Sequence, residues 1–195
     1  MSRLPRNTIL AGLAVLAALA LGACGESHTR VTTGTYSGGS GKNAPYLNVG
    51  PLVYEVQLSR QLNPYDTEDA SYLLGLTPAQ RVLHPGEEWF GVFMQVYNNS
   101  DVPHPVSTSF TVSDTQGNVY WPTALGPANL FAYRAGLLPA GGRVPALDTV
   151  AAGGPTQGAL LLYRIKVISL NNRPLELKIF DPGDAALTAS AELDV

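Results

Sequence analysis

Residues 89–97 read Trp-Phe-Gly-Val-Phe-Met-Gln-Val-Tyr and are apolar at nearly every position. Side chains alternate between the two faces of a β-strand, so this stretch would present large apolar groups on both faces. Such a run, followed by turn residues, is typical of a strand buried between two layers. Asn98-Asn99-Ser100 at its end matches a glycosylation acceptor, but its position favours a turn. We therefore expect residues 89–97 to form the central strand of the fold.

Six further segments have the character of strands, and most of them alternate apolar and polar residues with a period of two. They are residues 52–58, 106–112, 119–121, 159–168, 175–180 and 186–195. In the first of them, the alternation places Leu52, Tyr54, Val56 and Leu58 on one face. About seven short strands separated by turns predict an all-β fold, a β-sandwich, over residues 46–195, and the family resemblance given below implies that it is immunoglobulin-like.

Two longer segments interrupt this pattern and predict short helical insertions. Asp66-Thr67-Glu68-Asp69 resembles a helix start, because acidic side chains are favourable at a helix N-terminus. The same carboxylates could hold Ca²⁺, but the segment lacks the ligand spacing and the final bidentate Glu of a calcium-binding loop, so the helix start is preferred. The Gly- and Pro-rich stretch 122–155 is long for a loop, and we expect a short helix in it near residues 128–135.

Four pieces of the sequence match strand ends and turns of a known family. They are residues 85–87, 96–100, 110–120 and 158–165. They resemble an immunoglobulin-like domain of exported actinobacterial proteins, many of them lipoproteins, that is related to the telokin-like immunoprotective extracellular domain. The resemblance covers about residues 47–182 and implies a β-sandwich but no activity. Residues 61–83 and 121–156 are longer than such domains usually carry, and they are named here the first insertion and the second insertion.

The first 24 residues have the three parts of an export signal. Arg3 and Arg6 give the positive start, and an uncharged apolar run follows at residues 9–21, shorter than the about 20 residues of a membrane-spanning helix. Leu21-Gly22-Ala23-Cys24 then resembles a bacterial lipobox, whose first three residues are recognised by a signal peptidase that cuts before the Cys. Cys24, the only cysteine, would carry a diacylglyceryl group on its sulfur. An ordinary signal peptide and an N-terminal membrane helix are the alternatives.

The anchor and the composition define the expected organisation, location and partners. We expect residues 1–23 to be the signal peptide, 24–45 the lipidated Cys with a flexible Gly- and Ser-rich tether, and 46–195 the sandwich. A disordered end without a selected length is the other interpretation of the tether. Two acyl chains hold a protein firmly on a bilayer, so the chain should lie on the cell membrane and face the extracytoplasmic side. Without Arg3 and Arg6, 10 basic and 15 acidic side chains remain, which argues against a nucleic-acid partner.

Signals for catalysis, metals and cofactors are missing from the sequence. It contains no Gly-x-Ser-x-Gly elbow, no Cys–His nucleophile pair and no phosphate-binding loop between a strand and a helix. His28, His84 and His104 lie in separate segments, so a metal site would need tertiary convergence. We expect no catalytic residue, no metal and no cofactor, although a carboxylate pair for glycoside chemistry depends on a separation that the sequence does not give.

Four aromatic residues in or beside the insertions are the remaining candidates for a binding surface. They are Tyr65, Trp121, Phe131 and Tyr133. If the insertions meet at one end of the sandwich, these rings would form an apolar contact surface, since loops on a rigid scaffold commonly carry binding. The other interpretation, which we prefer, is that the rings cap the two sheets as a satellite core. The sequence thus favours a lipid-anchored module that binds a protein or an envelope component. The alternatives are an envelope structural or accessory protein, a small-ligand carrier and an enzyme.

Overall fold

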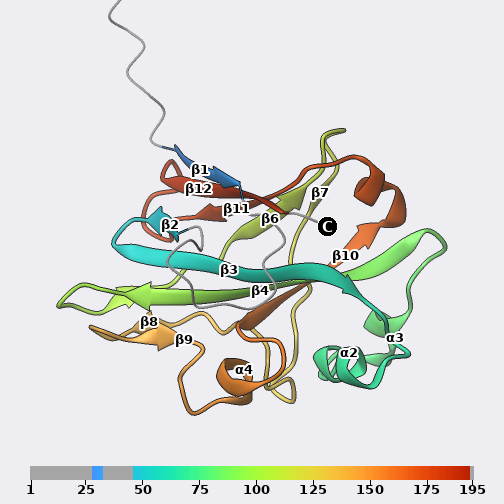
Figure 1. Cartoon of the computed structure of the whole chain (residues 1–195), viewed down its shortest axis with the longest axis horizontal. Coiled ribbons are helices and arrows are strands. Elements are labelled where there is room, and N and C mark those ends of the chain that lie inside the picture. Colours follow the sequence, from blue (N-terminus) through green and yellow to red (C-terminus); the bar gives the residue numbers. More distant parts are fainter. Residues whose placement is uncertain (1–27, 33–45, 194–195) are drawn as a thin grey trace, which may run out of the picture.

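The structure, a computed structural model, describes residues 28–32 and 46–193 (Figure 1). The expected signal peptide, its recognition residues Leu21, Gly22 and Ala23, and the lipidation residue Cys24 lie outside these residues. Strand β1 (His28–Thr32) lies within the range that was expected to be a tether, and it pairs in parallel with the last strand of the chain.

Two five-stranded sheets form the body of the molecule. Sheet A has the order β1, β12 (Thr188–Leu193), β11 (Leu175–Phe180), β6 (Phe110–Ser113) and β7 (Val119–Tyr120). Sheet B has the order β10 (Ala159–Lys166), β4 (Glu87–Asn98), β3 (Leu52–Leu62) and β2 (Tyr46–Val49), and β9 (Arg143–Val144) pairs with the second half of β4. A small ribbon joins β5 (His104–Pro105) and β8 (Leu137–Leu138). The predicted all-β, immunoglobulin-like sandwich is confirmed.

The main core lies between the two sheets. Fully buried side chains of β4, such as Phe90 and Met94, face Leu177 and Ile179 of β11 across the sandwich. The central position of β4 is confirmed, since β3 pairs along one of its edges and β10 and β9 along the other. The turn after β4 is also confirmed, because the Asn98 amide donates to the backbone oxygens of Val102, Leu138 and Pro139.

A β-bulge between Val56 and Leu58 reverses the alternation of β3. Tyr54 and Val56 belong to the main core, whereas Leu58 pairs with Phe93 and packs on the opposite face of sheet B. The expectation that Leu58 shares a face with Leu52, Tyr54 and Val56 was therefore wrong. A bulge adds one residue to a strand, and each residue after it changes face.

The two insertions form a third layer on the outer face of sheet B (Figure 1). This layer contains the helices α2 (Thr67–Tyr72), α3 (Pro78–Arg81) and α4 (Val150–Gly153), while the 3-10 helix η1 (Val167–Asn171) follows β10. A second core fills the space between this layer and the sheet. Its buried members are Leu62, Tyr72, Leu73, Leu76, Trp89, Phe93, Leu125, Leu160 and Leu162.

The helix start expected at residues 66–69 of the first insertion is confirmed, whereas the helix expected in the second insertion is not found. Asp66 caps α2, because its carboxylate accepts hydrogen bonds from the backbone N–H groups of Glu68 and Asp69. Asp69 in turn lies 2.5 Å from the Arg60 guanidinium of β3, which fixes the helix to the sheet. The helix expected near residues 128–135 is absent, and that segment forms an extended loop with turns and one bridge to β10.

Candidate binding site at the edge of the sandwich

Residues 121–135 form a loop that runs along the free edge of β10, and we name it the edge loop. Pro122 bridges to Tyr163 in the antiparallel sense, and Ala132 bridges to Leu160 in the parallel sense. The Thr123 N–H donates to the Leu162 oxygen at 2.6 Å, and the Tyr133 N–H donates to the Leu160 oxygen at 2.8 Å. The loop therefore completes the edge of sheet B at two points and leaves a gap between them.

Two polar side chains hold the edge loop in one conformation. The Arg134 guanidinium donates to the backbone oxygens of Leu125, Gly126 and Asn129. The buried Asn129 amide donates to the oxygens of Tyr72, the last residue of α2, and of Leu74, and its own oxygen accepts the Phe131 N–H. These bonds satisfy backbone groups that a loop would otherwise leave exposed or unpaired.

The two insertions meet at a close backbone contact as well. The Gly126 N–H donates to the Gly75 oxygen at 3.1 Å, and Gly75 has a φ of 81°. A Cβ atom on Gly126 would lie 2.9 Å from the Gly75 oxygen, so the approach requires a residue without a side chain. The Thr156 hydroxyl adds a second link by donating to the Glu68 carboxylate at 3.2 Å. The contact between the insertions is therefore built into both segments.

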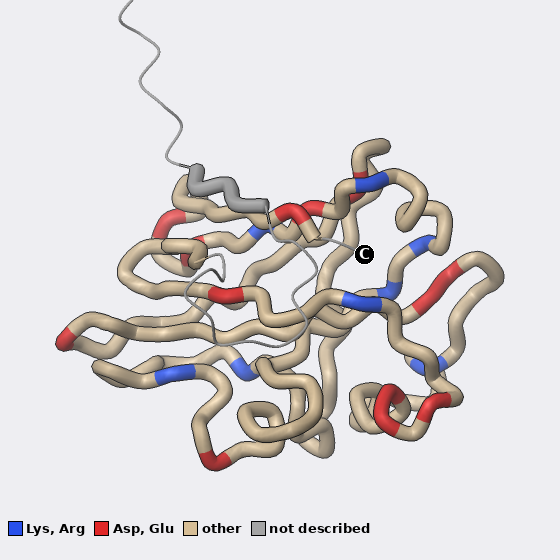
Figure 2. Tube along the Cα trace, viewed as in Figure 1, with Lys and Arg blue, Asp and Glu red and all other residues tan. Residues whose placement is uncertain are grey.

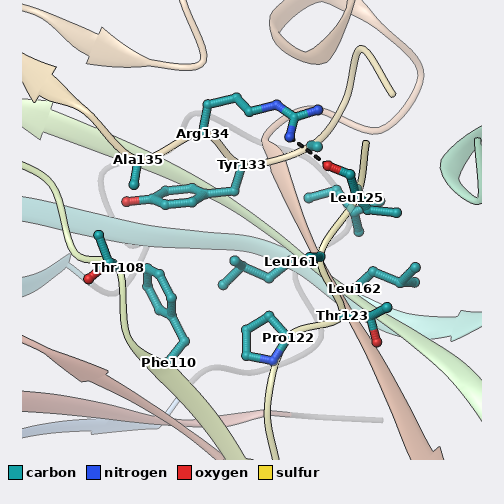
Figure 3. Close-up of a pocket in the computed structure, with 13 residues that line it drawn as sticks. Thr108, Phe110, Pro122, Thr123, Leu125, Tyr133, Arg134, Ala135, Leu161 and Leu162 are labelled. Atoms are coloured by element: carbon teal, nitrogen blue, oxygen red, sulfur yellow. Dashed lines mark hydrogen bonds between the residues drawn. The ribbon is translucent and has the colours of Figure 1, made fainter. Parts of the chain in front are cut away.

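A cavity of about 240 Å³ opens between the edge loop, β10 and the start of β6 (Figure 3). Figure 3 shows Phe110 and Pro122 along one side, Tyr133 with Arg134 along the other, and Leu161 between them. Thr108 and Thr123 also line the cavity and lie on either side of these residues in the view of Figure 3. The cavity reaches toward the main core from the side of the sandwich, because Phe110 and Leu161 are members of that core.

The electrostatic character of the cavity is nearly neutral. Arg134 is the one charged residue among those that line it, and its guanidinium is engaged by backbone oxygens. The Tyr133 hydroxyl donates to the Ser107 oxygen at 3.0 Å, and burial raises the pKa of Tyr133, so this ring stays uncharged. The lining is suited to an apolar side chain or a small apolar ligand, and it offers no carboxylate or imidazole for acid–base chemistry.

The four predicted aromatic residues divide into two pairs. The Phe131 ring packs edge-on against Tyr72 at 4.7 Å between centroids, and the Tyr133 ring packs in the same way against Phe110 at 5.1 Å. Tyr65 and Trp121, in contrast, are 95% and 65% exposed. Two of the rings thus extend the cores, while the other two lie at the surface.

Sequence reasoning missed most of the residues that line the cavity. Phe110 and Leu161 had been placed in strands without a further role, and Arg134 had not been singled out. Their convergence follows from the path of the edge loop, for which the sequence offered only its Gly and Pro content.

The other candidates from the sequence do not converge. His84 precedes β4 and His104 pairs with Leu138 beyond its end, so the two lie near opposite ends of a 12-residue strand. Among the described residues, no group of three or more His, Cys, Asp or Glu side chains is arranged to hold a metal. Basic and acidic positions are scattered over the described chain, and no large basic patch stands out in the view of Figure 2. No helix in the described segments has the length and apolar character needed to cross a bilayer.

Comparison with known proteins identifies related folds. No protein-family model and no curated protein sequence matches the chain. The structure is similar to that of the yjhA protein of Bacillus subtilis, with 12% sequence identity, a TM-score of 0.51 and coverage of 83% of this chain and 100% of the other. This likeness agrees with the sandwich described above and shows the fold alone.

Two further solved structures share less of the arrangement. One is ycdA, a candidate lipoprotein of Bacillus subtilis, with 10% identity, a TM-score of 0.43 and coverage of 76% of this chain and 38% of that one. The other is an uncharacterized β-sandwich protein of Clostridium difficile, with 8% identity, a TM-score of 0.44 and coverage of 86% and 95%.

Proposed function

We propose that this protein is a non-catalytic binding module, held on the extracytoplasmic side of a membrane by a lipid on Cys24, that binds another protein or an envelope component. The binding surface in this proposal is the edge loop with Trp121 and the cavity beside it. The proposed family relation is to lipid-anchored relatives of the telokin-like immunoprotective extracellular domain, on the strand and turn segments named above.

The exposed indole of Trp121 is the observation that carries the binding proposal. Trp121 is 65% exposed and directly precedes Pro122, which lines the cavity. Exposing a large apolar ring costs free energy in water, and Trp is among the residues most enriched at the centres of protein interfaces. The bonds made by Arg134 and Asn129 hold the loop in place, so a partner would lose little conformational freedom on binding it.

The anchor proposal rests on the sequence of the first 24 residues. Leu21-Gly22-Ala23-Cys24 has the form of a lipobox, and Cys24 is the only cysteine. A diacylglyceryl group supplies two acyl chains, which suffices for stable attachment to a bilayer.

A photo-crosslinking residue at position 121, in the full chain within its own cells, tests the binding surface. The matched control carries the same residue at Leu147, which is 75% exposed on the same insertion. We expect a defined partner to be captured from position 121 and not from position 147. With that purified partner, Trp121→Ala should weaken the affinity at least about tenfold, as expected for an interface anchor. Identical products from both positions, or an unchanged affinity, would contradict the proposal.

The cavity favours a small-ligand carrier as a second candidate. A volume of about 240 Å³ with an apolar lining suits a compact apolar molecule. Leu161→Trp would fill this space while leaving the Trp121 side chain in the sequence. Loss of a bound small molecule from that variant, with protein capture from position 121 absent, would support the carrier over the binding module.

A further inference from the structure

A second surface lies on the outer face of sheet B, over β2, β3, β4 and β9. The strand register aligns its side chains in two rows, because directly paired residues lie on the same face. One row is Tyr46, Glu55 and Gln95, and the other is Asn48, Val53, Tyr97 and Arg143. With strands about 4.8 Å apart, the second row spans about 14 Å. We name these residues the tyrosine rows.

Polar contacts fix the middle of the tyrosine rows. The Tyr97 hydroxyl donates to the side-chain oxygen of Gln95 and lies 3.3 Å from a Glu55 carboxylate oxygen. The Arg143 guanidinium donates to the same Gln95 oxygen at 3.0 Å and lies over the Tyr97 ring at 5.6 Å. Burial, together with the charge of Glu55, raises the pKa of Tyr97 to about 12, so its hydroxyl remains a donor.

The burial of this network is unusual for a face that points away from the main core. Glu55 is 3% exposed and Gln95 is 5% exposed. Burying polar groups costs free energy unless they are hydrogen-bonded, so a face needed only for packing would carry apolar residues, as the other half of the same face does with Trp89 and Phe93.

Next to this network lies a shallow pocket of about 410 Å³, lined by Tyr46, Asn48, Val53, Tyr97 and Asn99. Tyr46 is 50% exposed and Val53 forms a half-buried apolar floor. Within the described residues, the side-chain amides of Asn48 and Asn99 have no hydrogen-bond partner, and both are exposed. Each amide offers both donors and an acceptor to a ligand.

This combination matches the chemistry of a sugar. A sugar ring has an apolar C–H face that packs on an aromatic ring, and its hydroxyl groups act as donors and acceptors at once. Tyr46 and Val53 supply the apolar contacts, while Asn48 and Asn99 supply planar groups that can pair with neighbouring hydroxyls. The opposite charges of Glu55 and Arg143 in one network favour a neutral ligand over an anionic one.

We propose that the tyrosine rows and the pocket beside them form a binding site for a neutral glycan chain. The site shares no lining residue with the cavity beside the edge loop, so a test of one site does not decide the other. The open, shallow shape suits a polymer that lies across the strands rather than a small molecule that is enclosed.

Native affinity electrophoresis of the unlipidated chain 25–195 tests this site. The gels contain a soluble neutral glucan, mannan or galactan, or no polysaccharide. We expect at least one polysaccharide to retard the chain, and Tyr46→Ala or Asn48→Ala to weaken the apparent affinity at least about fivefold. Leu147→Ala, at a position that is 75% exposed and lines neither proposed site, should be retarded like the unchanged protein.

Urea unfolding serves as the folding control, since both substituted side chains are exposed and the variants should unfold at the midpoint of the unchanged chain. Tyr46→Phe keeps the ring and should retain most of the retardation, which separates stacking from loss of structure. Migration of the unchanged chain that none of the three polysaccharides alters would overturn the proposal, as would equal retardation of Tyr46→Ala.

Discussion

At the scale of single residues, two buried asparagines define the loops of this molecule. Asn98 and Asn129 are 1% and 2% exposed, and each amide donates to backbone oxygens of a segment distant in sequence. An amide can donate twice and accept twice, so one side chain can satisfy several backbone groups that have no partner in a helix or sheet. The conformations of these loops therefore depend on individual side chains.

Asn129→Ala should lower the free energy of unfolding by about 2–3 kcal/mol, because it leaves the oxygens of Tyr72 and Leu74 without their donor. Urea unfolding monitored by Trp fluorescence measures the change. Leu130→Ala is the control, since Leu130 is 68% exposed and its truncation should cost less than about 0.5 kcal/mol. Equal stability of the two variants would show that the amide does not hold the loop.

At the scale of elements, local patterns predicted the strands and could not predict how the insertions pack. The apolar run at residues 89–97 and the alternation at 175–180 became β4 and β11, because burial between layers imposes these periods. The bulge in β3 was missed, since one extra residue leaves no mark in composition. The edge loop has no period at all, and its path is decided by tertiary hydrogen bonds from Arg134 and Asn129.

The same limit applies to the candidate site. The sequence could select the four aromatic residues of the insertions, Tyr65, Trp121, Phe131 and Tyr133. Their exposure depends on which of the rings find a partner in one of the two cores. The tyrosine rows were not predicted, because their members come from four strands and become neighbours only through the pairing register.

The turn between β6 and β7 is held together by one carboxylate, that of Asp114. The Asp114 carboxylate accepts hydrogen bonds from the N–H groups of Gln116 and Asn118 and from the amides of Asn118 and Asn172. Burial opposes its ionisation, but these bonds outweigh it and hold the pKa of Asp114 far below its usual value. The contribution of the charged form is therefore present above the unfolded pKa of about 3.9 and is lost as the pH falls below about 4.

Asp114→Asn should destabilise the protein at neutral pH and make the loss of stability in acid shallower. The measurement is the urea midpoint of both proteins between about pH 7 and pH 2.5. Asp101→Asn, at an exposed position in another turn, should leave the slope as it is. An Asp114→Asn variant that loses stability in acid as steeply as the unchanged protein would contradict this assignment.

At the scale of the whole molecule, the chain is a three-layer body with two cores that share sheet B. Tyr72 and Leu125 from the two insertions bury Trp89 and Phe93 of β4, so removing an insertion would uncover the second core. Tests of function should therefore replace exposed side chains and leave both insertions in the chain.

Attachment of the whole protein to the membrane should depend on Cys24 alone. Cys24→Ser removes the sulfur that would receive the diacylglyceryl group, and the chain should move from the membrane fraction to the soluble fraction. Mass spectrometry of the unchanged protein should find a lipid on the N-terminal Cys24. A Cys24→Ser chain that still sediments with membranes would refute the lipid anchor.

The pairing of β1 with β12 determines how far the body could stand from such an anchor. β1 begins at His28, four positions after Cys24, and an extended chain advances at most about 3.6 Å per residue. The link between the lipid and the folded body is therefore at most about 14 Å long. Residues between β1 and β2 follow β1 in the chain, so they do not lengthen this link. The edge of sheet A at β1 (Figure 1) would therefore lie close to the lipid headgroups, and a partner would have to approach the bilayer to within the size of this one domain to be bound.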